Sequence, residues 1–320
     1  MHEACGRHDT GWAHPEHQGR LPAILHAVYE QTPDFLDRVM QVEGAFASEE
    51  DVLRVHTSAH LERLRKAAQF ASETNRIVGL DTETLVSPAS WEAAFASAGS
   101  VVTAVALVLE GAVPTAFALT RPPGHHATED IAMGFCLLNN IAIAARWLQG
   151  HGVQRVLIVD WDVHHGNGTQ DIFYTDPNVY YFSLHQHPLY PGTGHPEERG
   201  AGAALRTNRN VQVAEGTGGT RYQQLFRAAL DDVLSEFAPQ FVLVSAGFDC
   251  LRGDPLGGLN LEPDDLHALT RILRERVGAS VPAVYVLEGG YNPPRIGAGV
   301  VAVLRALAGL PAEGSPSPAI

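Results

Sequence analysis

The sequence predicts an α/β protein with one domain, built on an open parallel β-sheet of about eight strands flanked by helices. Two observations support this fold class. Short apolar runs rich in β-branched and aromatic residues recur along the 320 residues, and longer segments with helical periodicity separate them. These runs are almost continuously apolar, which is typical of strands covered on both faces. Strands that alternate with helices in this way indicate parallel strand–helix–strand units.

Five strands and five helices stand out along the chain. The expected strands cover 115–120, 155–160, 178–184, 240–246 and 283–288. The expected helices cover 90–110, 136–150, 220–237, 263–278 and 293–309. Within RYQQLFRAALDDVLSEF (221–237), apolar residues recur at helical spacing and charged residues occupy the other face.

The domain organisation is simple. No Gly/Ser-rich linker and no internal repeat divides the chain, so one catalytic-size domain is expected over residues 1–310. The last stretch, PAEGSPSPAI (311–320), has the composition of a disordered tail. The first residues, MHEACGRHDT, lack the apolar core of a secretory signal.

Composition narrows the classes of partner. The chain has 22 Lys and Arg against 36 Asp and Glu, a net charge of −14. Such a surface disfavours nucleic acid and anionic membranes and favours cationic partners, although it also fits simple solubility. Three separated cysteines without a CxxC pair indicate a reducing compartment, and no uninterrupted apolar run of about 18 residues suggests a membrane span. We therefore expect a cytoplasmic protein.

Polar residues follow each expected strand. The sequences after the five strands begin RPPGHHA, WDVHHGNG, HQHPLYPGTG, GFDCLRGDPLGG and GGYN. In an open parallel sheet, ligands bind outside the carboxyl ends of the strands. This concentration of His, Asp, Tyr and Gly-rich turns therefore predicts a site at that edge.

Three of these residues form a candidate metal site. Asp162 and His164 are two residues apart, so an extended chain points both side chains the same way, and Asp249 follows another strand. Two carboxylates and one imidazole leave an open position, as in catalytic zinc sites. Manganese or iron also accepts these ligands. A lone Asp-x-His pair equally fits a buried salt bridge, but the third residue favours a metal.

Two adjacent histidines, His125 and His126, are candidates for proton transfer. They follow a proline pair and a glycine that permits a sharp turn. A neutral imidazole can take a proton from an attacking water and return it to a leaving amine. Asp160 lies two residues before Asp162 on the same strand and is the natural partner for one of them, since an Asp–His bond fixes the tautomer.

Further candidates come from the neighbouring loops. Tyr291 follows a Gly pair, so its phenol can approach the site and donate to a developing oxyanion, although a tyrosine in such a turn is often only packing. Apolar loop residues either line a narrow channel to the site or close the core. These are Phe135, Leu189, Tyr190 and Leu256.

Taken together, these motifs resemble the zinc-dependent histone deacetylase family, which has the arginase–deacetylase fold. The matching blocks run in family order from residue 8 to residue 291, nearly the whole chain. The sequences of these blocks are more similar to the class II branch and its bacterial relatives than to class I. The blocks are HDTG, HPE, RPPGHHA, GFCLLNN, VDWDVHHGNGTQ, SLHQHPLYPGTG, SAGFD, GDPLGGLNL and LEGGY.

The resemblance implies a role for each matching residue. Asp162, His164 and Asp249 are then the zinc ligands, His126 is the general base and acid, and His125 is its electrostatic partner, bonded to Asp160. Tyr291 polarises the scissile carbonyl. The residues that match the acyl-lysine tunnel are Gly134, Phe135 and Tyr190. Family members also bind potassium. One matching site comprises Asp160, Asp162, His164, Ser183 and Leu184, and part of a second comprises Phe173, Asp176 and Val179.

The chain departs from the family at three places. Asn167 replaces the Asp that class I members pair with the second histidine, so His126 is expected to be less cationic. Gln18 replaces a proline, a change expected to be minor. Relatives have a short apolar strand where this chain begins with Met1, so either that strand is missing or the start lies further upstream.

The resemblance implies a zinc-dependent amidohydrolase that removes acyl groups of the acetyl type from lysine side chains of proteins or peptides. An acetylpolyamine or other small acyl-amide hydrolase is the main alternative. Polyamine-selective relatives carry an acidic gatekeeper where this chain has Leu256, which favours acyl-lysine. An inactive acyl-lysine binding module and an arginase-like manganese enzyme are less favoured. Asp81 and Glu83 are expected at the rim. The sequence leaves the acyl group, the physiological substrate and the oligomeric state open.

Overall fold

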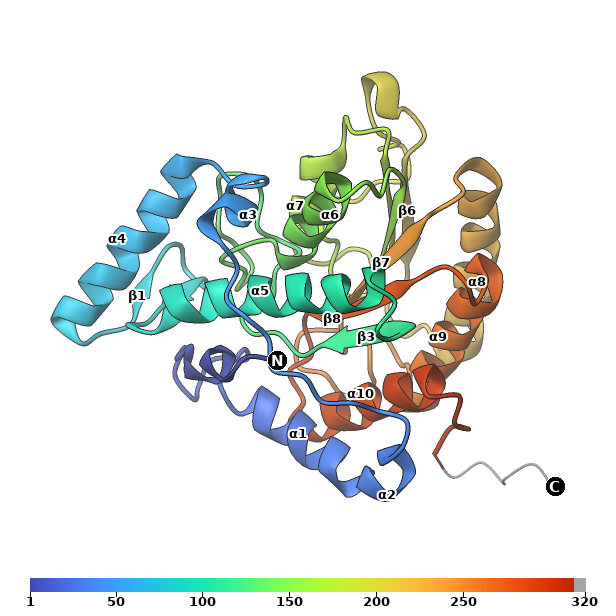
Figure 1. Ribbon diagram of the computed structural model, residues 1–320, viewed down its shortest axis with the longest axis horizontal. Coiled ribbons are helices and arrows are strands. Elements are labelled where there is room, and N and C mark those ends of the chain that lie inside the picture. The colour runs from blue at the N-terminus through green and yellow to red at the C-terminus, as the bar shows by residue number, and fades with distance from the viewer. Residues whose placement is uncertain (314–320) are drawn as a thin grey trace.

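The computed structural model describes residues 1–313 and shows a six-stranded parallel sheet between two layers of helices (Figure 1). The strands lie in the order β3-β8-β7-β4-β5-β6. Two further short strands form a separate antiparallel pair, so the predicted sheet of about eight strands contains six. The bounds are β1 Val78–Gly79, β2 Leu85–Val86, β3 Thr115–Ala118, β4 Val156–Asp160, β5 Val179–Gln186, β6 Asn208–Val213, β7 Phe241–Ala246 and β8 Ala283–Leu287.

Helices cover both faces of the sheet. One face carries α1, α8, α9 and α10, and the other carries α4, α5 and α6. The bounds are α1 Arg20–Glu30, α2 Thr32–Phe35, α3 Glu49–Leu53, α4 Ser58–Thr74, α5 Ser90–Leu109, α6 Asn140–Gly150, α7 Asn167–Phe173, α8 Gly219–Glu236, α9 Pro263–Val277 and α10 Pro293–Leu307, with 3-10 turns at Glu3–Arg7 and Gly202–Ala204. The expected helix over 136–150 begins at residue 140, because the side chain of Asn139 caps it.

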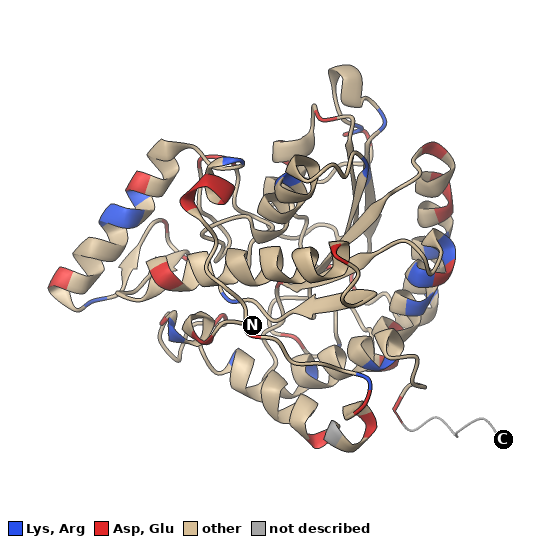
Figure 2. Ribbon diagram, in the orientation of Figure 1, with Lys and Arg blue, Asp and Glu red and all other residues tan. Residues whose placement is uncertain are grey.

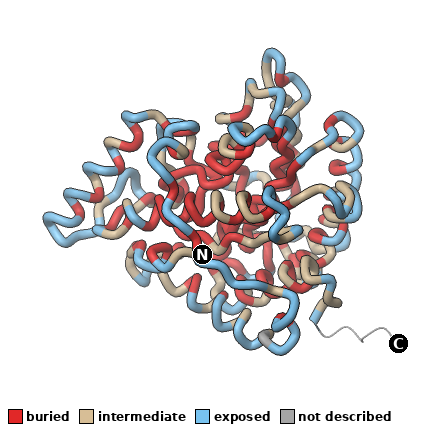
Figure 3. Tube along the Cα trace, in the orientation of Figure 1, coloured by how far each residue is buried: buried red, intermediate tan, exposed pale blue. Residues whose placement is uncertain are grey.

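The central strands have two buried faces. In β4, Leu157 and Val159 pack with α8 residues such as Phe226, whereas Val156 and Ile158 pack on the opposite side. Figure 3 shows this buried centre surrounded by exposed helices and loops. Figure 2 shows that charged residues lie mostly on the outer helices and loops. The continuous apolar runs in the sequence follow from this double coverage.

All five expected strands are confirmed, and one strand of the sheet was missed. β6 reads NRNVQV and lies at the edge of the sheet, where only some of its residues are buried. Two of its three buried positions carry Asn208 and Asn210, whose side-chain amides donate to Gln170 Oε1. The strand therefore lacks the continuous apolar signal that located the others.

The most apolar helix is α5. Among the described residues it is the one helix long and apolar enough to cross a membrane, judged by length and composition, with a mean hydropathy of 1.8. In the fold, 67% of that apolar window is buried, and α5 packs against β3, β8 and α6. These contacts account for its uniform hydrophobicity.

The parallel arrangement brings the carboxyl ends of the strands to one edge. At the end of β4, Asp160 lies opposite Ser183 of β5 and Ser245 of β7. The loops that follow β3, β4, β5, β7 and β8 therefore meet above the centre of the sheet.

Candidate metal and catalytic site

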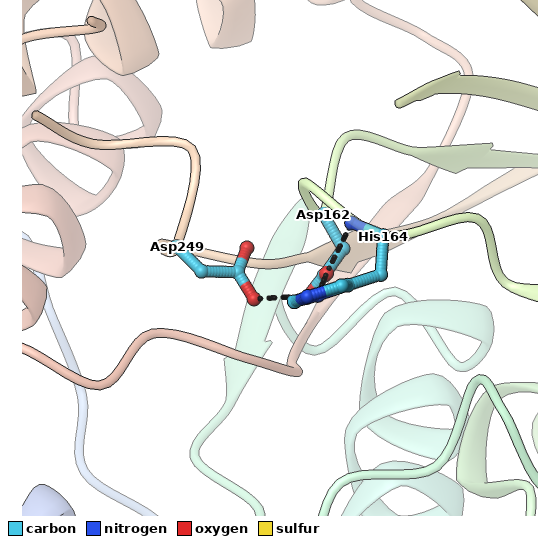
Figure 4. A group of neighbouring side chains, drawn as sticks. All are labelled: Asp162, His164 and Asp249. Carbon is cyan, nitrogen blue, oxygen red and sulfur yellow. Dashed lines mark hydrogen bonds and ion pairs between the residues drawn. The ribbon is translucent and has the colours of Figure 1, made fainter. Parts of the chain in front are cut away.

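Asp162, His164 and Asp249 meet at this edge (Figure 4). Asp162 and His164 follow β4, and Asp249 follows the neighbouring strand β7. One potential ligand atom from each lies within 4.8 Å of the others, and all three residues are buried. His164 Nδ1 is 3.0 Å from Asp162 Oδ1 and 3.2 Å from Asp249 Oδ2. The structure thus brings together the three residues predicted from the sequence.

Backbone amides orient the two carboxylates. The N–H of Gly289 donates to Asp162 Oδ2, and the N–H of Val163 donates to Asp249 Oδ1, both at 2.9 Å. A Cβ on Gly289 would lie 2.1 Å from Asp249 Oδ2, so only glycine fits there. Asp249 Oδ2 is buried, and apart from its contact with His164 Nδ1 it has no hydrogen-bond partner among the described residues. A buried carboxylate oxygen with a single polar partner is costly, and here it lies within reach of both other candidate ligands.

The electrostatics of the triad favour a cation. Burial raises the pKa of Asp249, and the charge of Asp162 adds to that shift. Burial opposes the charged form of His164, but the carboxylates of Asp162 and Asp249 outweigh it and raise its pKa to about 10. The buried carboxylates of Asp162 and Asp249 therefore share one proton donor, Nδ1 of His164. A divalent cation would satisfy both, because oxygen and imidazole donors suit zinc, manganese and iron.

His125 and His126 occupy the turn after β3 and have different partners. His125 Nδ1 is 3.0 Å from Asp160 Oδ2, whereas His126 Nδ1 is 2.8 Å from Asn167 Oδ1. An amide oxygen only accepts hydrogen bonds, so the proton of His126 lies on Nδ1 and its Nε2 keeps a free lone pair. A neutral histidine in this tautomer is suited to accept a proton at Nε2.

The charges of the two histidines diverge for physical reasons. Burial opposes protonation of His125, but Asp162 and Asp160 prevail and raise its pKa to about 10. Burial lowers the pKa of His126 far below its ordinary value, and the positive charges of His125 and His164 lower it further. The pair therefore contains one cation and one neutral base in van der Waals contact, with ring centroids 4.0 Å apart.

Tyr291 lines the same cavity as His126 and His164. Its backbone N–H donates to Asp254 Oδ2 at 2.6 Å, and Gly290 before it has φ +116°, a conformation that favours glycine. The buried guanidinium of Arg20 lies over the Tyr291 ring, 5.1 Å from its centroid, and donates to the carbonyl of Gly290 at 2.7 Å. Burial raises the pKa of Tyr291, so the phenol remains a donor.

A cavity of about 220 Å³ leads to these groups. Its walls are mostly apolar, and its inner end presents His126, His164 and Tyr291. The ring of Tyr190 lies 5.2 Å from that of His126, and the ring of Phe135 lies 5.6 Å from that of Tyr291. The remaining lining residues are Glu83, Gly134, Leu189 and Leu256. The lining thus includes all four apolar loop residues that the sequence offered for a channel, namely Phe135, Leu189, Tyr190 and Leu256.

Of the two acids expected at the rim, Glu83 and Asp81, the structure places only Glu83 in the lining of the cavity. Glu83 lines the cavity, and its carboxylate adds to burial in raising the pKa of Tyr190. Asp81 instead accepts the backbone N–H groups of Glu83 and Thr84 and so shapes the turn. His14 supports the same wall, because its Nε2 lies 3.0 Å from the carbonyl oxygen of Glu83 and its ring packs on Phe135.

The residues that match potassium sites lie in two groups. Ser183 lies opposite Asp160, and the carbonyl of Leu184 accepts the hydroxyl of Tyr222 at 3.0 Å. Phe173, Asp176 and Val179 follow one another between α7 and β5 through successive backbone hydrogen bonds. Their potassium binding stays a prediction.

Two residues at the site carried no assigned role in the sequence. Arg20 contacts Tyr291 as described, although only its place in the HPEHQGR segment pointed to it. Glu288, inside the LEGGY motif, has its side chain bonded to the turn that carries His125. The sequence feature that could have identified Glu288 is its position, an acidic residue between a core strand and a Gly pair.

Comparison with known proteins agrees with this geometry. The family model for the histone deacetylase domain matches residues 14–307. A probable deacetylase of Archaeoglobus fulgidus is 38% identical over 91% of this chain and 80% of its own length. Histone deacetylase 15 of Arabidopsis thaliana is 38% identical over 92% of this chain and 53% of its own. The crystal structure of the HDA15 HD domain superimposes with a TM-score of 0.91 at 36% identity, covering 99% of this chain and 88% of that one. The chain belongs to the histone deacetylase family.

Proposed function

We propose that this protein is a zinc-dependent amidohydrolase that removes acyl groups of the acetyl type from lysine side chains of proteins or peptides. One observation carries the proposal. Asp249 Oδ2, a buried carboxylate oxygen that pairs with His164 Nδ1 and has no further hydrogen-bond partner among the described residues, lies beside Asp162 at the inner end of a narrow apolar cavity. Membership of a deacetylase family supports the same reaction class.

Asp162, His164 and Asp249 would hold the metal. A bound zinc ion supplies Lewis acidity, which polarises the amide carbonyl and lowers the pKa of the attacking water. The Gly289 and Val163 amides keep the two carboxylates in place for this role. Manganese or iron fits the same donor set, so the native metal is part of what the experiment measures.

The protein's own residues move the protons. His126 accepts the proton of the attacking water at Nε2, because Asn167 holds its other nitrogen protonated. His126 then returns that proton to the leaving amine. The positive charge of His125, held by Asp160, offsets the negative charge that develops nearby. The hydroxyl of Tyr291 donates to the oxyanion, and the products are a carboxylate and a free amine.

The cavity selects a linear acylated chain. Phe135, Leu189, Tyr190 and Leu256 offer apolar surface to the methylene groups of a lysine side chain. Its volume of about 220 Å³ suits one such chain with a small acyl group at the inner end.

A panel of acylated lysine peptides and acylpolyamines tests the proposal. We expect hydrolysis of an acetyl-lysine peptide, loss of activity with a chelator, and recovery when zinc is added. A matched Asp249→Asn preparation gives the background rate of the triad variant. Activity that survives full metal removal would contradict the scheme, and binding of acyl-peptide without turnover would indicate a silent binding module instead.

An acetylpolyamine substrate is the second candidate, and Glu83 is the observation that favours it. This carboxylate lines the cavity, opposite in sign to the ammonium groups of a polyamine, and the net charge of −14 attracts the same cations. The apolar Leu256 in the same wall favours acyl-lysine. Rates with acetyl-lysine peptide and acetylputrescine, measured side by side, decide between them.

Potassium binding and a cytoplasmic location complete the proposal. The first potassium site would use Asp160, Asp162, His164, Ser183 and Leu184, and the second Phe173, Asp176 and Val179. If the sites exist, thermal stability rises more in KCl than in NaCl at equal ionic strength. Equal stability in the two salts would contradict structural potassium.

A further inference from the structure

The side chain of Glu288 reaches from the end of β8 to the turn that carries the two histidines. It is fully buried. Its Oε2 accepts the backbone N–H of Gly124 at 2.7 Å and that of His125 at 3.2 Å. Its Oε1 accepts the hydroxyl of Ser245, the last polar residue of β7, at 3.0 Å. One carboxylate therefore bridges the ends of three strand segments.

The backbone around Glu288 is bonded to the rest of the site. Its N–H donates to the carbonyl of Ala246 at 3.1 Å, and Arg20 donates to its carbonyl. The next residue, Gly289, donates to the Asp162 carboxylate, and Tyr291 follows two residues later. A single residue thus contacts the histidine turn with its side chain and adjoins both the metal triad and the phenol through its backbone.

A buried carboxylate in this place needs a reason. Burial raises the pKa of Glu288 to about 7, although the charge of His125 and the Gly124 amide oppose that shift. Among the described residues, no lysine or arginine side chain forms an ion pair with it. Its bonds are directed at the two amides of the turn, which would otherwise be buried donors without acceptors.

We propose that Glu288 is a positioning residue that fixes the Gly124–His125–His126 turn relative to the Asp162 carboxylate and Tyr291. The base and the oxyanion donor must face the same amide carbon from different strands, and Glu288 is the residue that joins both. This role rests on the proposed amidohydrolase function. Glu288 acts through other residues, because it does not line the substrate cavity.

Two substitutions separate this role from the alternatives. In Glu288→Gln, the amide oxygen still accepts the Gly124 and His125 N–H groups, and the amide nitrogen donates to the Ser245 hydroxyl, which also accepts. The bridge therefore survives without its charge. Glu288→Ala removes the bridge and leaves the turn free to shift, and a displacement of about 1 Å is enough to lower the rate roughly 100-fold.

The kinetic expectation follows directly. We expect kcat of Glu288→Gln to stay within about threefold of the wild-type value. We expect kcat of Glu288→Ala to fall roughly 100-fold, with KM changed less than about threefold. Thr270→Val is the matched control, since it removes a buried side-chain hydrogen bond inside α9, to Leu266, far from the site. That control should lose stability and keep kcat.

A readout without turnover keeps the test independent of the proposed reaction. Amide hydrogen exchange at Gly124 and His125 should stay slow in the wild type and in Glu288→Gln, and become at least about tenfold faster in Glu288→Ala. If the wild type hydrolyses none of the acyl substrates, the proposed function fails, while the exchange measurement still tests the bridge.

Glu288→Gln/Ser245→Ala covers the case in which the alanine variant does not fold. Without Ser245, the Gln amide nitrogen loses its acceptor and only the Gly124 and His125 N–H groups still orient the amide, so the double variant should lose more activity than the product of the two single effects. Three results would overturn the proposal. They are full kcat in folded Glu288→Ala, an equal loss of activity in Glu288→Gln and Glu288→Ala, and strictly multiplicative effects in the double variant.

Discussion

The side-chain oxygen of Asn167 lies 2.8 Å from Nδ1 of His126, so an uncharged partner holds the histidine proposed as the base. The neighbouring His125 has a carboxylate partner instead, Asp160. The two partners have different effects. The neutral amide fixes the tautomer of His126 without favouring its imidazolium form, whereas the carboxylate fixes the tautomer of His125 and also favours its imidazolium form.

Asn167→Asp tests that asymmetry with a nearly isosteric change. A carboxylate beside His126 Nδ1 favours the protonated imidazole, so the pKa of His126 rises by about one to three units. The acidic limb of the kcat/KM profile should therefore move to higher pH. The rate at pH 6 should fall more than the rate at pH 9. A profile that keeps its shape would mean that His126 is not the group titrated on that limb.

Removal of the Tyr291 hydroxyl should affect the rate and spare binding. Tyr291→Phe keeps the ring under Arg20 but loses the oxyanion donor, so kcat should fall about 10²- to 10³-fold with little change in KM. Tyr285→Phe is the matched control, because its buried hydroxyl on β8 has no hydrogen-bond partner. Equal activity of Tyr291→Phe and wild type would remove this role.

Asp249→Asn should change stability in opposite directions with and without metal. The raised pKa of Asp249 reports a buried charge near Asp162, and asparagine removes that charge while still accepting the Val163 N–H. At pH 8 the chelator-treated variant should be at least as stable as chelator-treated wild type.

With zinc bound, wild type should instead be more stable than Asp249→Asn. Zinc at about 100 times its Kd should stabilise wild type by about 2.7 kcal/mol, and this gain should vanish in Asp249→Asn. Urea unfolding measures both free energies. Asp171→Asn, a substitution of an acid outside the triad, should retain the zinc effect.

Glu83→Gln should reduce selectivity for cationic substrates. An ammonium group near a partly exposed carboxylate gains about 0.2–1 kcal/mol, so kcat/KM for acetylputrescine should fall up to about fivefold. The value for an uncharged acyl amide should not change, and added salt should diminish the difference. Glu110→Gln, at an exposed position after α5, is the control. Equal losses with both substrates would place Glu83 in a purely structural role.

His56 should make the fold sensitive to acid. Burial lowers its pKa to about 3, and its Nε2 accepts the Asn139 N–H. The unfolded chain protonates near the ordinary value of 6.5, so His56 stabilises the fold above that pH and the contribution is lost as pH falls toward 3.

Urea titrations between pH 7 and 5 measure this effect. Between pH 6 and 5, the free energy of unfolding should fall in both proteins. The fall should be about 1 kcal/mol per pH unit smaller in His56→Gln than in wild type. The exposed His26→Gln serves as the control. Parallel slopes in wild type and His56→Gln would show that His56 is protonated in the folded protein as well.

Much of the fold was predictable because double burial leaves a strong mark on a sequence. The runs VLIV before Asp160 and FVLV before Ser245 are apolar without interruption, and both proved to be central strands. Strand β6 was missed because two of its buried positions, Asn208 and Asn210, are polar and interrupt that apolar signal. The short pair β1 and β2 has two residues per strand, which is too few to show any periodicity.

The site was predictable where strand ends carry unusual residues. Asp162, His164 and Asp249 stand directly after strands, and topology alone brings such positions together. Glu288 and Arg20 were harder to identify, because their importance lies in backbone contacts with residues more than a hundred positions away. Such contacts leave no local pattern in the sequence.

The buried apolar helix α5 has a consequence for how this protein fails. When the fold opens, a segment of twenty residues with no charge after Glu92 becomes available to other unfolded chains. Self-association then competes with refolding, so heating at high protein concentration should lead to aggregates rather than to an equilibrium. Under those conditions the apparent thermal midpoint should depend on the unfolding rate and shift with the heating rate.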